Sequence, residues 1–179
     1  MNVRIPGWVR GSVLPSDLYS YDDDQKLGYR VSVNGQEVIG ELRKGYLQIE
    51  RKWKKGDVVE VHFDMQPRIV KANEKVTADR GRVAIERGPI VYCAEWPDND
   101  FNIQNILLNQ YPKFQVIEKP NLLYGIKTLT TSAQSLNYDT AGKLVTKDVT
   151  LTLIPYYAWA HRGEGRMDVW LPINLINLK

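Results

Sequence analysis

Apolar and polar residues alternate along most of the chain, a pattern typical of β-strands with one face in a core. Residues 29–33 alternate in this way. The Asn34-Gly35 dipeptide that follows favours the positive φ angles of a tight hairpin turn. The same alternation recurs at residues 46–50, 59–63, 82–86, 149–153 and 167–171. The pattern therefore predicts a series of short antiparallel strands.

Residues 90–94 form a continuous apolar run instead, which is typical of a strand covered on both faces. Helical periodicity is weak, and residues 102–108 are the one stretch that could form a short helix. The sequence contains no phosphate-binding glycine motif and no parallel βαβ rhythm. We predict an all-β fold of antiparallel β-sandwiches, with surface loops at 15–26 and 96–109 and a seam near residues 66–68.

The 179-residue chain carries a formal net charge of +3, and 43% of its residues are hydrophobic. Acidic and basic residues are interspersed, so no basic stripe predicts nucleic-acid binding. We interpret the basic run at residues 51–55 as a solvated turn, with anion binding as the alternative. No apolar run reaches the roughly 20 residues of a membrane helix, and residues 1–10 do not resemble a signal peptide. The sequence is compatible with either a cytoplasmic or a periplasmic location.

No arrangement of acidic or nucleophilic residues predicts catalysis. Acid–base cleavage of a glycosidic bond normally needs a pair of carboxylates, but Glu60 and Glu86 alternate outward on their predicted strands. We interpret the aspartates at residues 22–24 as a solvated loop, with a cation contact or a catalytic role as alternatives. Cys93 lies in the apolar run and is expected to be a buried structural thiol. Two histidines and one cysteine without short ligand spacing make a four-ligand zinc site hard to build, so we expect no catalytic residue, metal or cofactor in this chain.

Aromatic side chains are the feature that could bind a ligand. We expect Trp8, Trp53 and Trp159 to fill the space between sheets, because each lies among apolar neighbours. Trp96, beside a proline in a predicted loop, is the best candidate for an exposed platform. The residues that could stack on sugar rings or contact another domain are Trp96, Tyr156, Tyr157, Trp159 and His161.

Several unusual strings occur in a fixed order along the chain. They are RIPGW at residues 4–8, VNG at 33–35, RGPIVYC at 87–93, LIPYYAWA at 153–160 and MDVW at 167–170. Together they resemble the C-terminal region of glycoside hydrolase family 127, the β-L-arabinofuranosidase-like enzymes. The resemblance covers nearly the whole chain.

The resemblance implies that the active site of the parent enzyme lies in an (α/α)6 barrel preceding these sandwiches. In that family the barrel holds the nucleophile, a zinc-bound cysteine thiolate, so no catalytic role passes to Cys93. The chain is therefore expected to be a non-catalytic part that braces the barrel or mediates dimerisation. The alternatives are an autonomous carbohydrate-binding module and a protein–protein interaction module. The implied partners are the barrel, a second copy of the chain and a plant-type oligosaccharide.

The family pattern also implies two jelly-roll-like sandwiches, with the last strand returning to the first. On that basis we expect residues 1–68 and 155–179 in the first sandwich and residues 69–154 in the second. The chain departs from the pattern by starting at the RIPGW strand and by carrying His161 where asparagine is expected. A sandwich without its earlier strands exposes strand edges and apolar surface, so we expect the isolated chain to self-associate or to be marginally stable.

Overall fold

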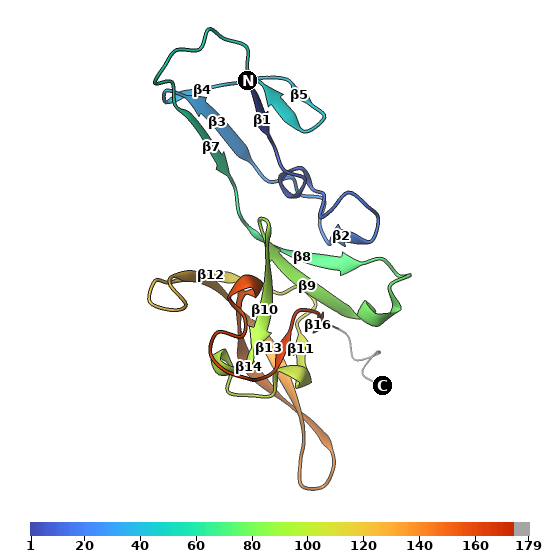
Figure 1. Ribbon diagram of the computed structural model, residues 1–179. Coiled ribbons are helices and arrows are strands. Elements are labelled where there is room, and N and C mark those ends of the chain that lie inside the picture. The colour runs from blue at the N-terminus through green and yellow to red at the C-terminus, as the bar shows by residue number, and fades with distance from the viewer. Residues whose placement is uncertain (174–179) are drawn as a thin grey trace.

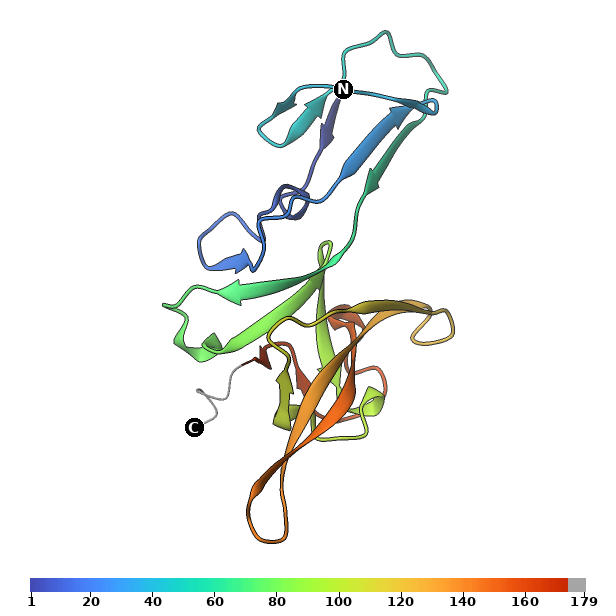
Figure 2. The same ribbon diagram turned by 180° about the vertical axis from the view of Figure 1, so that it is seen from behind.

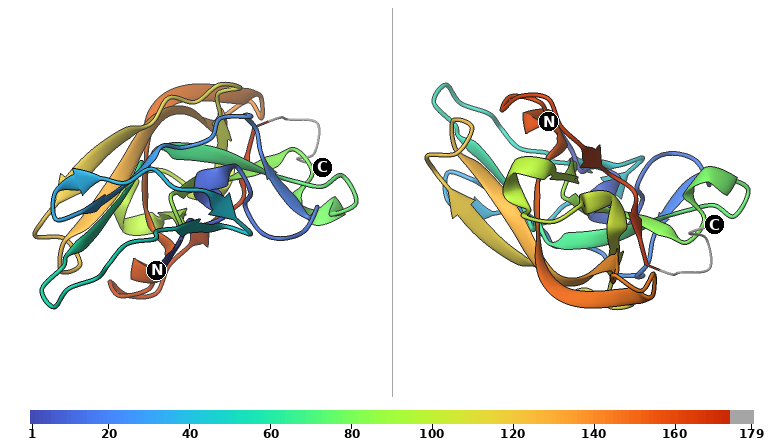
Figure 3. Two further views of the ribbon diagram at one scale, coloured as in Figure 1. Left: turned by 90° about the horizontal axis from the view of Figure 1, so that it is seen from above. Right: turned by 90° about the horizontal axis from the view of Figure 1, so that it is seen from below.

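The computed structural model describes residues 1–173, and its regular elements are β-strands and single turns of 3-10 helix (Figure 1). No helix of seven or more residues occurs in this part of the chain, which confirms the predicted all-β class. None of the helical turns within residues 1–173 has the length and apolar character needed to cross a bilayer. The strands form an N-terminal and a C-terminal unit, stacked along the long axis of the molecule (Figures 1 and 3).

The N-terminal unit consists of two three-stranded antiparallel sheets that enclose a small core. One sheet has the order β1 (Asn2–Arg4), β6 (Tyr46–Gln48), β5 (Leu42–Arg43), and the other β4 (Gln36–Glu37), β3 (Tyr29–Val33), β7 (Val59–Phe63). Val31 and Val33 are buried between the sheets, and Trp8 and Trp53 pack against the same core. Asn34 and its following glycine have positive φ angles, 53° and 77°, as the predicted hairpin requires.

The C-terminal unit is one sheet of ten strands that folds over on itself (Figure 2). Its main path runs β11 (Ile106–Leu108), β13 (Ile126–Tyr138), β14 (Leu144–Pro155), β10 (Ile90–Glu95), β9 (Arg82–Arg87), β8 (Pro67–Ala72), β2 (Tyr19–Tyr21). Three short strands attach to it: β12 (Gln115–Lys119) on β13, β15 (Met167–Asp168) on β10 and β16 (Leu171–Pro172) on β9. The long β13–β14 hairpin extends away from the body of the molecule.

Strand β10 is buried on both faces, as its continuous apolar run predicts. On one face Tyr92 and Ala94 belong to the main core, together with Leu153 of the paired strand β14 and Leu129 of β13. On the other face Cys93 belongs to a separate cluster beneath the turn η5 (Tyr156–Ala158). The remaining helical turns are η1 (Trp8–Arg10), η2 (Thr77–Asp79), η3 (Trp96–Asp98) and η4 (Ile103–Asn105).

Strand pairing differs from the expected division of the chain. Residues 155–179 are expected in the first sandwich, but β15 and β16 pair with β10 and β9 of the C-terminal unit. The physical reason is that Leu171 is buried in the main core of that unit. Residues 174–179, the remainder of the segment expected in the first sandwich, lie outside the described residues.

The two predicted surface loops also contain regular structure. Residues 15–26 include β2, which pairs with β8. Residues 96–109 include η3, η4 and β11, and the stretch 102–108, the one that could form a short helix, is a single 3-10 turn followed by a strand. Ile103, Ile106 and Leu108 are buried there, and their burial in the main core fixes this segment against β13.

One buried arginine joins the two units. Arg68 on β8 is 5% exposed and donates hydrogen bonds to both carboxylate oxygens of Asp23, at 2.7 and 3.2 Å. Its guanidinium carbon lies 3.4 Å from the centroid of the Tyr21 ring, a cation–π contact. It also faces the main-chain carbonyl of Trp8 in the N-terminal unit. Asp23 was expected to be a solvated loop residue, but it neutralises a buried charge at this junction.

Replacing Asp23 by alanine should lower the free energy of unfolding by about 2–3 kcal/mol at pH 7, because Arg68 loses its counter-ion in a buried site. Asp22→Ala is the matched control. Asp22 pairs with Lys71 near the surface, where ion pairs contribute about 0–1 kcal/mol. Urea unfolding of both variants measures the difference, and equal losses would contradict the role given to Arg68.

The effect of Asp23→Ala should also depend on pH. Burial tends to raise the pKa of Asp23, but hydrogen bonds from Arg68 and the Gln25 amide outweigh it, so folding lowers this pKa. The stabilisation is therefore complete above the unfolded-state pKa of about 4 and is lost as the pH falls through the folded-state value. We expect the gap between wild type and Asp23→Ala to shrink from pH 7 to pH 2.5 in urea unfolding. A gap of constant size would contradict this.

Candidate functional site

Aromatic side chains project from η5 because the middle of this turn is anchored in the core. Ala158 packs with Cys93 beneath the turn, and the rings of Tyr156, Tyr157 and Trp159 stay at the surface. The Tyr156 and Trp159 rings are stacked, with centroids 6.2 Å apart and planes inclined by 8°. The expectation that Trp159 fills the space between sheets is therefore wrong, because Ala158 takes the buried position.

Trp96 lies close to this turn, at the start of η3. Its amide donates to the carbonyl of Arg166 at 3.1 Å. The main chain of Gly165 lies against the indole, so a Cβ added at Gly165 would overlap the ring. Gly165 and Trp159 in turn line one small pocket. Gly165 therefore contacts Trp96 and also lies beside Trp159.

We call these four residues, Trp96, Tyr156, Tyr157 and Trp159, the aromatic surface. Their exposed fractions lie between 38% and 64%, and all four were predicted as candidates from the sequence. The fifth candidate, His161, is exposed beside them, with its Nδ1 3.2 Å from the carbonyl of Ala158. His161 thus contacts the main chain of η5, next to the aromatic rings.

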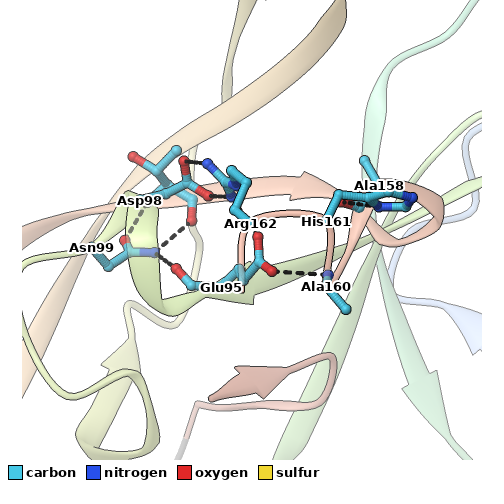
Figure 4. Close-up of polar contacts among 8 residues, drawn as sticks. Glu95, Asp98, Asn99, Ala158, Ala160, His161 and Arg162 are labelled. Carbon is cyan, nitrogen blue, oxygen red and sulfur yellow. Dashed lines mark hydrogen bonds and ion pairs between the residues drawn. The ribbon is translucent and has the colours of Figure 1, made fainter. Parts of the chain in front are cut away.

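A cluster of charged side chains holds residues 160–162 against the end of β10 (Figure 4). Glu95 is 2% exposed; its Oε1 accepts a hydrogen bond from the Ala160 amide at 3.0 Å, and its Oε2 pairs with Arg162. Arg162 also pairs with Asp98 through two hydrogen bonds, one of them from Nη1 at 2.8 Å. The cluster therefore connects the segment after η5 to both β10 and η3, and so fixes both parts of the aromatic surface.

Asn99 completes the polar contacts at the base of this cluster. Its side-chain nitrogen donates to the carbonyls of Glu95 and Thr152, at 2.9 and 3.1 Å, and its oxygen accepts from the Thr152 amide at 2.9 Å. Hydrogen bonds from Arg162 to Asp98 and Glu95 raise the pKa of Arg162 above its usual range. Arg162 is therefore charged at any ordinary pH, and the cluster is a permanent ion pair network.

This network is not arranged for acid–base chemistry. All four carboxylate oxygens of Glu95 and Asp98 already accept hydrogen bonds from Arg162 or the Ala160 amide. Within residues 1–173 no three His, Cys, Asp or Glu side chains are placed together as metal ligands. The thiol of Cys93 is buried, and burial, with the charges of Glu95 and Asp98, raises its pKa to about 12. The arrangement supports a rigid contact surface.

Sequence reasoning found the aromatic residues but not the charged groups that hold them. Glu95 directly follows the apolar run at 90–94, whereas Asp98 and Arg162 lie in segments without a clear pattern. A signal was present, because a carboxylate that continues a doubly buried strand needs a cationic partner. That partner is 67 residues away along the chain, and no local pattern identifies it.

The fold defines a pair of β-sandwich units with a rigid, exposed aromatic surface, and comparison with known proteins identifies the family. Residues 1–65 match the family model described as the β-L-arabinofuranosidase GH127 middle domain. Residues 67–172 match the glycoside hydrolase family 127 C-terminal domain. The chain therefore belongs to glycoside hydrolase family 127.

Individual relatives agree with this assignment. The chain is 34% identical over 182 aligned residues to the non-reducing end β-L-arabinofuranosidase of Bifidobacterium longum subsp. longum, covering 94% of this chain and 25% of that protein. A solved GH127 β-arabinofuranosidase is 75% identical with a TM-score of 0.93, covering 97% of this chain and 27% of its own. A GH127 β-L-arabinofuranosidase from Geobacillus stearothermophilus T6 is 35% identical with a TM-score of 0.77, and the match covers 97% of this chain and 26% of that protein's chain. The chain thus spans about a quarter of the length of these relatives.

Replacing Arg162 by methionine should lower the free energy of unfolding by about 3–5 kcal/mol, because Glu95 becomes an unpaired buried charge. Arg166→Met is the matched control, since Arg166 is exposed and makes one hydrogen bond to Asn102. The tryptophan emission of Arg162→Met should also shift, because the segments that carry Trp96 and Trp159 are no longer held together. Chemical unfolding followed by fluorescence measures both effects, and similar curves for the two variants would contradict the role of the network.

Cys93 should not react with iodoacetamide in the folded protein at pH 8, because the thiol is buried and its pKa is raised to about 12. The same thiol should react fully in 6 M guanidinium chloride. Mass spectrometry after alkylation measures the modified fraction. Rapid labelling of the folded chain would show that Cys93 is an accessible thiolate and would contradict its structural role.

Proposed function

We propose that this chain is the non-catalytic β-sandwich region of a β-L-arabinofuranosidase-like glycoside hydrolase, and that it braces the remainder of that enzyme through the aromatic surface. The proposal rests on an exposed set of tryptophan and tyrosine side chains. The chain that carries them spans about a quarter of the length of its relatives. The arabinofuranosidase activity itself is proposed for the parent enzyme, from the names of those relatives.

The aromatic surface has the properties of an interface centre. Tryptophan and tyrosine are enriched where proteins contact each other, because they bury a large area at a small cost in side-chain entropy. Here the rings of Tyr156 and Trp159 are already stacked on each other. The ion pair network of Glu95 and Arg162 holds the turn that carries them. A partner therefore meets a preorganised surface, which reduces the ordering cost of association.

The groups that could take part in chemistry are engaged in supporting this surface. Cys93 is buried under η5, and the carboxylates of Glu95 and Asp98 are paired with Arg162. These roles favour a structural contribution by this region, with bond cleavage performed by the part of the parent enzyme outside this chain.

A chimera tests the proposal. This chain replaces the matching segment of the solved relative that is 75% identical to it. We expect the chimera to hydrolyse an aryl arabinofuranoside and the isolated chain to show no turnover. In the chimera, the double variant Tyr156→Ser/Trp159→Ser should lower the transition temperature, because it removes the aromatic contacts of the interface, and it should leave the isolated chain unchanged. Tyr138→Ser, at the exposed tip of the β13–β14 hairpin, is the control.

Other outcomes assign the surface differently. Turnover by the isolated chain would reject a non-catalytic role. Saturable binding of an arabino-oligosaccharide that the double variant abolishes would indicate a carbohydrate-binding module. A dimer of the isolated chain that dissociates in the double variant, seen by analytical ultracentrifugation, would assign the surface to a second copy of the chain.

A further inference from the structure

A separate pocket lies at the waist of the molecule, where the chain passes from the N-terminal to the C-terminal unit. Its apolar walls are formed by Met65 after β7, by Ile90 on β10 and by Pro155 before η5. The segment from β12 to the start of β13 closes another side. The volume is about 390 Å³, within the range of about 300–1,000 Å³ that is usual for ligand sites. Tyr157 of the aromatic surface lines its rim, so the two features adjoin.

Arg87 is the unusual residue in this pocket. It ends β9, and alternate residues of a strand share one face. Val83 and Ile85, the preceding members of that row, are fully buried in the main core. Arg87 is therefore a charged residue at the end of an inward-facing row, and it is only partly exposed. Its Nε is buried and makes no hydrogen bond within the described residues.

Glu118 lies near enough for its charge to interact with Arg87, but Arg87 forms no direct ion pair within the described residues. Glu118 is the one carboxylate that lines it in the described part of the chain, and this side chain pairs with Lys127 at 2.6 Å. Lys119 adds a further positive charge. The lining therefore contains three cations, Arg87, Lys119 and Lys127, against one carboxylate. The hydroxyl of Tyr92 donates to the carbonyl of Lys127 at 2.9 Å and also lies beside the Arg87 guanidinium.

We propose that this pocket binds the carboxylate of an aspartate or glutamate side chain from the part of the parent enzyme that lies outside this chain. A guanidinium group matches a carboxylate through parallel hydrogen bonds. A half-buried arginine with a free Nε carries a desolvation cost that such a partner offsets. The inference rests on the proposed function, because the pocket adjoins the aromatic surface and about three quarters of each relative lies outside this chain.

The test compares one substitution in two settings, the isolated chain and the chimera described above. Arg87→Met should leave the transition temperature of the isolated chain unchanged or raise it, because it removes a charge that forms no direct ion pair within the described residues. In the chimera it should lower the transition temperature, because a buried carboxylate loses its partner. Arg80→Met is the matched control, since Arg80 is exposed and far from the pocket lining. Arg87→Lys should recover part of the loss in the chimera.

Each result decides the question. Equal destabilisation of the isolated chain and the chimera, including failure of Arg87→Met to fold alone, would mean that Arg87 acts within this chain, and would overturn the proposal. No change in either setting would also overturn it. If Tyr156→Ser/Trp159→Ser destabilises the chimera and Arg87→Met does not, the aromatic surface contacts the rest of the enzyme as proposed. The proposal that the Arg87 pocket binds a carboxylate would then be wrong.

The same carboxylate chemistry could be supplied by a free sugar acid, and titration separates this source. Galacturonate and glucuronate are added to the isolated chain and followed by NMR, with neutral galactose as the control. Saturable binding that Arg87→Met abolishes, together with an unchanged transition temperature in the chimera, would replace the polypeptide partner by a small-molecule ligand. Weak binding with a destabilised chimera supports the proposal.

Discussion

Strand β10 is buried on both faces, and the rest of the C-terminal unit follows from the need to cover it twice. One face packs into the main core, where Tyr92 and Ala94 lie with apolar residues of β9, β11, β13 and β14. The other face requires a second cover, which η5 supplies through Ala158 above Cys93. Because backbone groups on a central strand must also be paired, β9, β14 and β15 all hydrogen-bond to β10. The short turn η5 thereby acquires a fixed place on the outside of the sheet.

This constraint explains why aromatic side chains are exposed here. When Ala158 is buried, its neighbours in the turn must point outward, and they are large and aromatic. Glu95, the last residue of β10, then becomes a buried carboxylate that the chain neutralises with Arg162. A buried ion pair contributes little net stability but strongly disfavours arrangements that separate its partners. The surface is consequently held in one geometry, which is the property that a docking interface needs.

Buried or partly buried charged residues occur at three places in the structure. Arg68 and Asp23 fix the junction between the two units, and Glu95, Asp98 and Arg162 fix the aromatic surface. In both sets the charges are neutralised within the chain. Arg87 differs, because the pocket that surrounds it holds more cations than carboxylates. Under the proposed function, this excess of positive charge is what remains available to a partner outside the chain.

Local patterns determined the fold class and most strand positions, since alternation, the apolar run and the Asn34-Gly35 turn act between close neighbours in the chain. They also identified the exposed aromatic residues as the candidates for contact. The placement of residues 155–173, the burial of Ala158 in place of Trp159, and the pairing of Arg68 with Asp23 and of Arg162 with Glu95 were decided by tertiary structure alone. These partners are 45 and 67 residues apart. Their energies depend on which surfaces the folded sheet brings together, and periodicity carries no information about contacts at that range.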